Sequence, residues 1–333
     1  MNKTAVVIGC SSQDGLLQMR LLLRSGYFVI GICRDRRRFD LCSAYVSSDL
    51  NSYRIIEFDF VDFSKLSDLF RPYHIDEIYN FVGVTSIAES WNDPYNTLRV
   101  NTLFLVSLLE YVRNNSTSTK VFQAGSSESF ITSLNADEDR FFATSPYGLS
   151  KLASYSLINL YRESFGIFVV NGILFNHESI FRREGFVSRK IVQGIKEIAQ
   201  DQSSVLVLGN LDSTRDWGDA EDFVLGFHQV LQNSEPGNYI FRSGNVATVR
   251  EVVEFCASCL GLDLIWKGAG IDEVGIQRSS GRVIIRVSSE FFRPLDTDYK
   301  SIGDFGSVMA NPWSASVGFK ELFKKLMEHD FVY

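Results

Sequence analysis

The order of strand-like and helical segments near the N-terminus constrains the fold of this chain most. Residues Thr4–Gly9 form an apolar run rich in β-branched side chains, the amphipathic stretch Leu16–Ser25 follows, and a second strand-like run covers Tyr27–Cys33. Glycines at positions 9 and 15 stand in the turn between the first strand and the helix. Two parallel strands need a helical crossover between them, so this order predicts the opening unit of a doubly wound parallel sheet.

The alternation of strand-like and helical patterns continues beyond this unit. Further strand-like runs cover Arg54–Phe58, Glu77–Phe81, Lys120–Ala124 and Phe168–Leu174. The clearest helical patterns between them cover Thr97–Arg113 and Tyr147–Phe165. We therefore predict an α/β protein with a Rossmann-type doubly wound parallel sheet that is covered by helices on both faces.

The alternation loosens after about Asn176. Helical patterns follow at Gly185–Gln200, Ala220–Gln232, Val249–Leu260 and Val317–Glu328. A chain of 333 residues is also longer than a single core usually supports. We predict a dinucleotide-binding domain over residues 1–175 and, over 176–333, a smaller C-terminal α/β substrate-binding lobe, and we leave open that segments of the second part return to the main domain.

Charge and hydropathy exclude several classes of protein. The net charge is −7 and the chain has no long basic run, which argues against nucleic acid as a partner because phosphate-backbone binders need a concentrated positive face. No apolar stretch approaches the roughly 20 residues of a membrane-spanning helix, and the N-terminus lacks the pattern of a secretory signal. We expect a cytoplasmic protein without a membrane segment.

The cysteines and histidines do not predict a metal site. Five cysteines, odd in number and scattered, suit reduced thiols in a cytosolic enzyme. Cys256 and Cys259 form a C-x-x-C within a helical stretch and have no second pair, so we interpret them as small core residues of a helix. The four histidines, at positions 74, 177, 228 and 329, show no ligand spacing.

Two segments of the first unit suit a dinucleotide. The turn Gly9-Cys-Ser-Ser-Gln-Asp-Gly15 has glycine at the first and last places of a G-x-x-G-x-x-G pattern, which allows the backbone to approach a pyrophosphate closely. After the second strand the chain reads Cys33-Arg-Asp-Arg-Arg-Arg38. Arginines there would neutralise a 2′-phosphate, so NADP is favoured over NAD. Asp35 leaves NAD as a second possibility for the cofactor. The alternative interpretation of the whole segment is a solvated basic loop.

The strongest local motif is Tyr147-Gly-Leu-Ser-Lys151, with Ser126-Ser-Glu128 upstream at the end of a strand. Positions i and i+4 share a helix face, so Tyr147 and Lys151 can point into one cleft. An ammonium near a phenol lowers the phenol pKa toward the range of a general base. The alternative is an exposed amphipathic pair, which the glycine turn and the upstream serine disfavour.

Together these features resemble the extended short-chain dehydrogenases, and further segments narrow the resemblance to the GDP-mannose 4,6-dehydratase family. The segments follow the family's order: Ser12-Gln-Asp-Gly15, Asp76-Glu-Ile-Tyr-Asn80, Ser145-Pro-Tyr-Gly148, Tyr161-Arg-Glu-Ser164, Asn171-Gly-Ile-Leu-Phe-Asn-His-Glu-Ser179, Arg189-Lys190, Leu208-Gly-Asn210, Arg215-Asp-Trp-Gly218 and Phe292-Arg-Pro294. They span nearly the whole chain, so the resemblance concerns both the fold and the substrate class.

The resemblance implies roles for particular residues. Those on the family's catalytic positions are Ser126, Glu128, Tyr147 and Lys151. Those on positions that hold the cofactor are Gly9, Ser12, Gln13, Asp14, Gly15, Arg34, Asp59, Phe60, Phe81, Val82, Gly83, Thr85, Tyr147, Lys151, His177 and Arg182. Those in segments around the nucleotide diphosphate are Asn176, Arg189, Lys190, Arg215 and Arg293.

The implied reaction converts GDP-mannose, or a related GDP-sugar, to its 4-keto-6-deoxy form by internal hydride transfer through tightly bound NADP. Glu128 would remove the C5 proton, a step that a simple reductase does not need. A 4-keto-sugar reductase or epimerase of the same fold, or a catalytically weak cofactor-binding partner subunit, remain the alternatives. The family also implies a homodimer or homotetramer.

Departures from the family gather around the cofactor positions. Ser12 replaces a glycine, Asp35 replaces an arginine, and Phe81-Val-Gly-Val-Thr85 replaces a stretch of the Leu-Ala-Ala-Gln-Ser type. Asn96 stands where a tyrosine is expected, and the loop between Glu128 and Tyr147 is shortened. These changes could retune the sugar or the cofactor, or weaken activity.

Overall fold

A computed structural model describes residues 2–47, 49, 51–60, 62–132, 141–201, 203–291 and 313–332, without the side chains of 131–132 and 141–142. The chain forms two compact units, each built from separate segments. Unit 1 comprises Met1–Phe175, Ala220–Phe241 and Ser301–Ser314. Unit 2 comprises Asn176–Asp219, Arg242–Lys300 and Ala315–Tyr333.

A seven-stranded parallel sheet in the order β13-β8-β5-β4-β1-β2-β3 organises unit 1. Its strands are β1 (Thr4–Ile8), β2 (Phe28–Cys33), β3 (Tyr53–Glu57), β4 (Glu77–Asn80), β5 (Lys120–Ala124), β8 (Val169–Leu174) and β13 (Asn238–Phe241). The predicted doubly wound parallel sheet is confirmed. The strand order reverses at β1, so the loops after β1 and β4 flank the switch point where ligands of such sheets bind.

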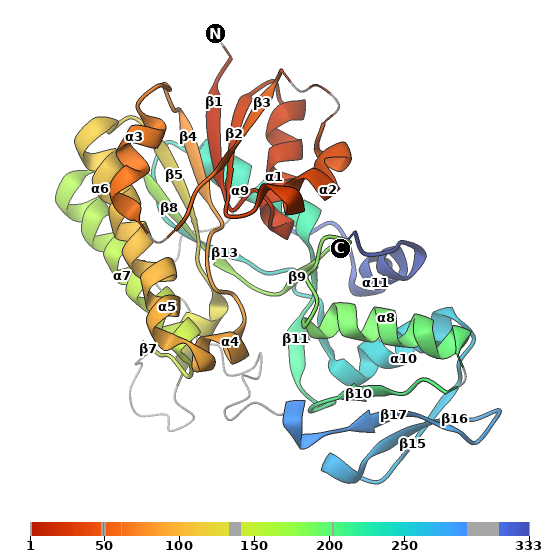
Figure 1. Cartoon of the computed structure of the whole chain (residues 1–333). Coiled ribbons are helices and arrows are strands. Elements are labelled where there is room, and N and C mark those ends of the chain that lie inside the picture. The colour runs from red at the N-terminus through yellow and green to blue at the C-terminus, as the bar shows by residue number, and fades with distance from the viewer. Residues whose placement is uncertain are drawn as a thin grey trace. The chain divides into compact units, whose positions relative to one another are not determined.

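Helices cover both faces of this sheet (Figure 1). One face carries α1 (Gln13–Arg24), α2 (Arg36–Val46) and α9 (Ala220–Leu231). The other carries α3 (Leu66–Phe70), α6 (Phe104–Asn115) and α7 (Pro146–Phe165), whose apolar side chains form one core with those of the strands. The remaining short elements are η1 (Phe63–Lys65), α4 (Ile87–Asn92), α5 (Pro94–Leu98), η2 (Arg99–Leu103), η3 (Ser127–Ser129), β6 (Ile131–Thr132) and β7 (Phe141–Phe142).

A helix predicted as continuous over Thr97–Arg113 is in fact interrupted. It begins as α5, passes through the π-helical turn η2 and continues as α6. Such π turns occur often beside functional sites. The apolar periodicity of the sequence does not reveal the interruption, because apolar residues continue through η2 into α6.

Unit 2 contains a four-stranded sheet in the order β10-β17-β16-β15, which the sequence did not predict. Its strands are β10 (Leu206–Leu208), β15 (Leu264–Lys267), β16 (Val274–Gln277) and β17 (Val283–Val287). The helices are α8 (Val187–Gln200), α10 (Val249–Cys259) and α11 (Phe319–Glu328), with η4 (Gly270–Asp272) and η5 (Ser289–Phe291). Two short ladders pair β9 (His177–Glu178) with β12 (Gly218–Asp219), and β11 (Thr214–Asp216) with β14 (Val246–Thr248).

The C-x-x-C lies on α10, as the sequence indicated, but only one of its two cysteines is a core residue. Cys256 is buried, whereas Cys259 is exposed because it falls on the outer side of the last helical turn. Among the helices of the described ranges, none is both long and apolar enough to cross a bilayer.

Candidate active site

Four loops that the sequence singled out leave the same edge of the parallel sheet. They follow β1 at Gly9, β2 at Arg34, β4 at Phe81 and β5 at Gly125. The strands are parallel, so their carboxyl ends meet at one edge. The fold therefore brings the glycine turn, the arginine-rich turn and the Ser126–Glu128 segment to the same edge of unit 1.

The glycine turn is packed too tightly for side chains at its two glycines. Gly9 has φ +84°, and a Cβ there would lie 3.1 Å from the backbone nitrogen of Val82. A Cβ at Gly15 would lie 2.2 Å from the Gly9 carbonyl oxygen. The turn thus presents bare backbone at the start of α1, which suits the close approach of a pyrophosphate.

Ser12 occupies the middle position of this turn without strain. Its φ is −82°, an angle that any residue adopts, and its hydroxyl accepts a hydrogen bond from the backbone N–H of Gly15 at 3.1 Å. Serine is a preferred N-cap because it satisfies one of the unpaired N–H groups of the first helical turn. The loss of the family's middle glycine is thereby explained, and the turn retains its shape.

The loop after β4 is braced by Asn101, a residue that the sequence did not point to. Asn101 lies buried in η2, where its amide oxygen accepts from Val84 N–H at 2.8 Å and its amide nitrogen donates to the Val84 carbonyl at 3.0 Å. The same nitrogen donates to the hydroxyl of Ser150 at 2.9 Å. A Cβ on Gly83 would lie 2.8 Å from the Asn101 amide oxygen and 3.9 Å from Nζ of Lys151.

This contact explains part of the unusual loop sequence Phe81-Val-Gly-Val-Thr85. Glycine at position 83 leaves the room that the Asn101 amide fills. Phe81 is a core residue whose ring packs near Phe122 and Phe227, and Thr85 is exposed. The only sequence signal for Asn101 is one polar residue within an apolar helical pattern, and that signal is common.

The segment after β5 carries Ser126 and Glu128. Ser126 caps η3, and its hydroxyl accepts from the backbone N–H of Glu128 at 3.2 Å. A Cβ on Gly148 would lie 2.6 Å from the Glu128 carbonyl oxygen. The first turn of α7 therefore approaches the backbone of Glu128 closely, and only glycine allows this contact.

Helix α7 presents Tyr147 and Lys151 from its first turns. Ser145 caps the helix by accepting from Gly148 N–H at 3.0 Å, and Pro146 occupies the first helical position, where its missing N–H costs nothing. Tyr147 is 9% exposed and Lys151 is 5% exposed. They are a buried pair, so the interpretation as an exposed amphipathic pair is wrong.

The ammonium group of Lys151 has a defined position. Its Nζ donates to the carbonyl oxygen of Ala124, the last residue of β5, at 2.7 Å and lies 5.9 Å from the centre of the Tyr147 ring. Burial lowers the pKa of Lys151 to about 8, while the Asp14 carboxylate acts in the opposite direction. The group therefore remains mostly charged at neutral pH.

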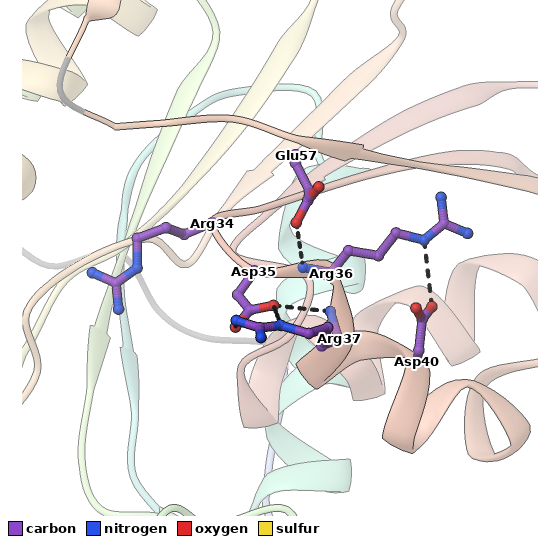
Figure 2. A pocket seen from close by; sticks show the side chains of 6 residues that line it. All are labelled: Arg34, Asp35, Arg36, Arg37, Asp40 and Glu57. Atoms are coloured by element: carbon purple, nitrogen blue, oxygen red, sulfur yellow. Dashed lines mark hydrogen bonds and ion pairs between the residues drawn. The ribbon is translucent and has the colours of Figure 1, made fainter.

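The arginine-rich turn lines an open cavity of about 620 Å³ after β2. Its lining consists of six charged residues, shown in Figure 2: Arg34, Asp35, Arg36, Arg37, Asp40 and Glu57. Of the two expected cofactor positions after β3, Asp59 is exposed. Phe60 packs its ring against Phe58 and Phe104 in the core.

In unit 2, Arg182 is held by a buried carboxylate. Its Nε donates to Glu178 at 2.6 Å, and its terminal nitrogen NH2 donates to the carbonyl of His177, which lies on β9. Glu178 also accepts from the hydroxyl of Ser188 at 2.6 Å. Arg189 is buried and donates to the Arg182 carbonyl at 2.8 Å, so it helps to shape this segment.

The other residues of the nucleotide-diphosphate segments lie elsewhere in unit 2. The Asn176 carbonyl accepts from Gly218 N–H at 3.0 Å. Lys190 places its ammonium 3.3 Å from the centre of the Phe291 ring, and burial lowers the pKa of this lysine. Arg215, on β11, donates to the Thr214 carbonyl at 2.7 Å. Arg293 lies outside the described residues.

Comparison with known proteins gives a consistent result over nearly the whole chain. The family model for GDP-mannose 4,6 dehydratase matches residues 6–326. GDP-mannose 4,6 dehydratase of Drosophila melanogaster is 31% identical, over 99% of this chain and 86% of its own. GDP-mannose 4,6-dehydratase of Vibrio cholerae is 32% identical, over 99% of this chain and 94% of its own.

The solved structures agree on the fold. The crystal structure of dTDP-glucose 4,6-dehydratase from Bacillus anthracis, in complex with NAD, superposes with a TM-score of 0.75 at 17% identity. The match covers 98% of this chain and 96% of that one. In the parts of the chain that the structure describes, no three His, Cys, Asp or Glu side chains gather in a way that could hold a metal ion.

Proposed function

The chain belongs to the GDP-mannose 4,6-dehydratase family, and we propose that it converts GDP-mannose, or a related GDP-sugar, to the GDP-4-keto-6-deoxy sugar. The observation that carries this proposal is the junction of β5, η3 and α7. There α7 carries the buried pair Tyr147 and Lys151, and the first turn of this helix packs against the backbone of Glu128, two residues after Ser126. A phenol, an ammonium, a hydroxyl and a carboxylate are the groups that oxidation, elimination and re-reduction of one hexose require.

The edge of unit 1 suits a nicotinamide dinucleotide, and we take NADP as the proposed cofactor. The glycine turn offers bare backbone at a helix N-terminus, and Arg34 stands in the turn after β2. The nicotinamide of this cofactor would accept the hydride from C4 of the sugar and return it at C6. NAD in the Bacillus anthracis neighbour supports a dinucleotide of this class.

Tyr147 is the proposed base for the 4-hydroxyl proton. The ammonium of Lys151 favours the phenolate electrostatically, and its hydrogen bond to the Ala124 carbonyl holds it in place. Ser126 would hold the sugar oxygen as it changes from hydroxyl to carbonyl. Removal of hydrogen from C4 leaves a ketone, which makes the proton on C5 acidic.

Glu128 is the proposed base for that C5 proton. The electron pair of the C5–H bond forms the C5–C6 double bond, and the 6-hydroxyl leaves as water with a proton from Glu128 or Ser126. Hydride return at C6 and protonation at C5 complete the product. Two hydrogens leave C4 and O4 and two enter at C6 and C5, so the reaction consumes no external oxidant or reductant.

Unit 2 is proposed to hold the nucleotide diphosphate through Asn176, Arg189, Lys190, Arg215 and Arg293, because guanidinium and ammonium groups pair with phosphate oxygens. Arg189 donates to Gln193 and to the Arg182 carbonyl, so its proposed part is to shape this segment as well as to attract the phosphates. We further propose that the protein is a cytoplasmic homodimer or homotetramer.

The direct test is to incubate the purified protein with GDP-mannose and NADP and to detect a 4-keto product by its absorbance in alkali. In heavy water the product is expected to carry deuterium at C5, because the proton removed by Glu128 exchanges with solvent. A reductase or epimerase would not lose water. Intact nucleotide binding without product would refute dehydration of this sugar.

The substitution Glu128→Gln separates chemistry from binding. Because an amide cannot remove the C5 proton, kcat is expected to fall by about 100-fold or more. Calorimetric affinity for GDP-mannose should stay within about twofold. Glu163→Gln, at the exposed C-terminal end of α7, is the control and should behave like the unmodified protein. Equal turnover of Glu128→Gln would refute the proposed role.

A further inference from the structure

The cavity after β2 contains as many carboxylates as guanidinium groups. Three arginines (Arg34, Arg36 and Arg37) and three acidic residues (Asp35, Asp40 and Glu57) form its lining, so their formal charges cancel. A 2′-phosphate carries nearly two negative charges and needs an excess of positive charge around it. The arginine-rich sequence Arg34–Arg38 therefore overstates the attraction for phosphate at this place.

Two of the three arginines are already paired. The Asp35 carboxylate accepts from both Nε and NH2 of Arg37, at 3.1 and 3.0 Å. Nε of Arg36 lies 3.5 Å from the Asp40 carboxylate, one helical turn further along. Figure 2 shows the Arg34 side chain directed away from these pairs, and within the lining it is the one arginine without an ion pair.

The backbone N–H groups at the start of α2 are also occupied. Asp35 accepts from the N–H of Arg37 at 3.0 Å, and Glu57 accepts from the N–H of Arg36 at 2.9 Å. A phosphate at a helix N-terminus would use these donors. Here two carboxylates already fill that role, and the hydrogen bond from Arg37 lowers the pKa of Asp35, so its charge persists at neutral pH.

We propose, on the premise that the proposed function is correct, that this pocket accepts both NAD and NADP with little discrimination. Arg34 is the group that binds the 2′-phosphate, and Asp35 is the residue that limits the preference for it. An unmodified ribose carries no charge and is not repelled, whereas the phosphate gains Arg34 but meets the other five lining residues, whose two arginines and three carboxylates leave one net negative charge.

The test measures binding of two cofactor fragments, 5′-AMP and adenosine 2′,5′-bisphosphate, to the full chain freed of bound nucleotide. The ratio of the two dissociation constants isolates the contribution of the 2′-phosphate to binding. Titration calorimetry is expected to give affinities within about tenfold of each other. Arg34→Ala should abolish any preference for the bisphosphate and leave AMP within about twofold.

Asp35→Asn is the decisive variant. Asparagine keeps a side-chain oxygen for the N-cap but removes the charge and releases Arg37. Affinity for the bisphosphate should rise about threefold to tenfold, with AMP unchanged within about twofold. Asp263→Asn is the control: Asp263 pairs with Arg278 at 2.6 Å in unit 2, so the variant alters net charge equally without changing the lining.

A preference of about a hundredfold for the bisphosphate in the unmodified protein would overturn the proposal. So would an Asp35→Asn variant that binds both fragments as Asp263→Asn does. If such a protein still dehydrates GDP-mannose, the proposed function stands and only the inference fails. If the protein binds neither fragment and neither whole dinucleotide, both fail together.

Discussion

Lys151 is a buried cation held by a single carbonyl, and its titration should govern the alkaline side of activity. Burial lowers its pKa to about 8, so the ammonium is present below that pH and lost above it. Because the folded pKa lies below the ordinary 10.5, this group makes the folded state more stable as pH rises from about 8 toward 10.5. The titration of Lys151 therefore does not itself destabilise the fold over the window in which turnover is expected to decline.

We expect kcat to fall as pH rises through about 8, when the Lys151 ammonium that supports the phenolate is lost. A pH profile of initial rates with saturating substrate measures this. Lys151→Met keeps the length of the side chain without the charge and should lose about 100-fold or more of kcat, together with the alkaline decline. A wild-type profile that stays level to pH 10 would contradict this account.

Glu77 is a second buried charge, at the amino end of β4 and therefore away from the edge that carries the proposed site. It accepts hydrogen bonds from Tyr79 at 2.8 Å, Tyr27 at 3.0 Å and Lys3 at 3.0 Å. Burial alone would raise the pKa of Glu77, but its hydrogen-bond donors, among them Gln232, outweigh burial and lower it. The network ties the start of β4 to Lys3, which precedes β1, and to Gln232, which follows α9.

Glu77→Gln should lower the free energy of unfolding by about 2–3 kcal/mol, since hydrogen bonds to a charged group are weakened and one amide N–H₂ faces other donors. Urea denaturation followed by circular dichroism measures it. Turnover per folded molecule should not change, because the network lies at the opposite end of the strands. An unfolding curve that coincides with that of the unmodified protein would refute the structural role.

At the scale of elements, the π turn η2 couples the loop after β4 to α7. Asn101 spans both, through Val84 on one side and Ser150 on the other. Gly83→Ala would place a Cβ 2.8 Å from the Asn101 amide oxygen, so it should weaken dinucleotide binding and lower Tm. In an Asn101→Ala background the amide oxygen is absent, so Gly83→Ala should lower Tm and dinucleotide affinity by less.

The double-mutant cycle of Gly83→Ala and Asn101→Ala is expected to show a coupling of about 1–2 kcal/mol in unfolding free energy. Thermal denaturation and titration with NADP provide the two measurements. Additive effects of the two substitutions would mean that the close contact does not constrain the loop. Gly318→Ala is the control, because a Cβ at Gly318 would meet open space. Gly26→Ala would be unsuitable because Gly26 has φ +81°.

At the scale of the molecule, unit 1 depends on chain that lies far beyond residue 175. Strand β13 pairs with β8, and α9 packs Phe227 against Phe122 of β5 with ring centres 4.5 Å apart. A fragment of residues 1–175 would leave the edge of β8 unpaired and the aromatic face of the sheet uncovered.

We therefore expect the 1–175 fragment to aggregate when produced alone, whereas the full chain stays in solution. Soluble yield and size-exclusion chromatography measure this, with near-ultraviolet circular dichroism as the readout of aromatic packing. A monomeric fragment with a cooperative unfolding transition would show that β13 and α9 are dispensable.

Periodicity and local motifs predicted much of unit 1. Lys120–Ala124 was predicted with the bounds that β5 has, and the strand patterns around β1, β2 and β8 were placed within about a residue. The sheet of unit 2 was not predicted because no α-helix separates β15, β16 and β17, so the alternation of strands and helices that revealed the sheet of unit 1 is missing there. Helix α2 and η2 were likewise not predicted.

The sequence by itself determined the parallel α/β fold, the glycine turn and the Tyr147–Lys151 pair, because each depends on residues close together along the chain. Only the tertiary structure decided that β13 completes the sheet, that Asn101 braces Val84, and that Glu57 occupies the start of α2. These contacts join residues far apart in sequence, so packing determines them and local pattern does not.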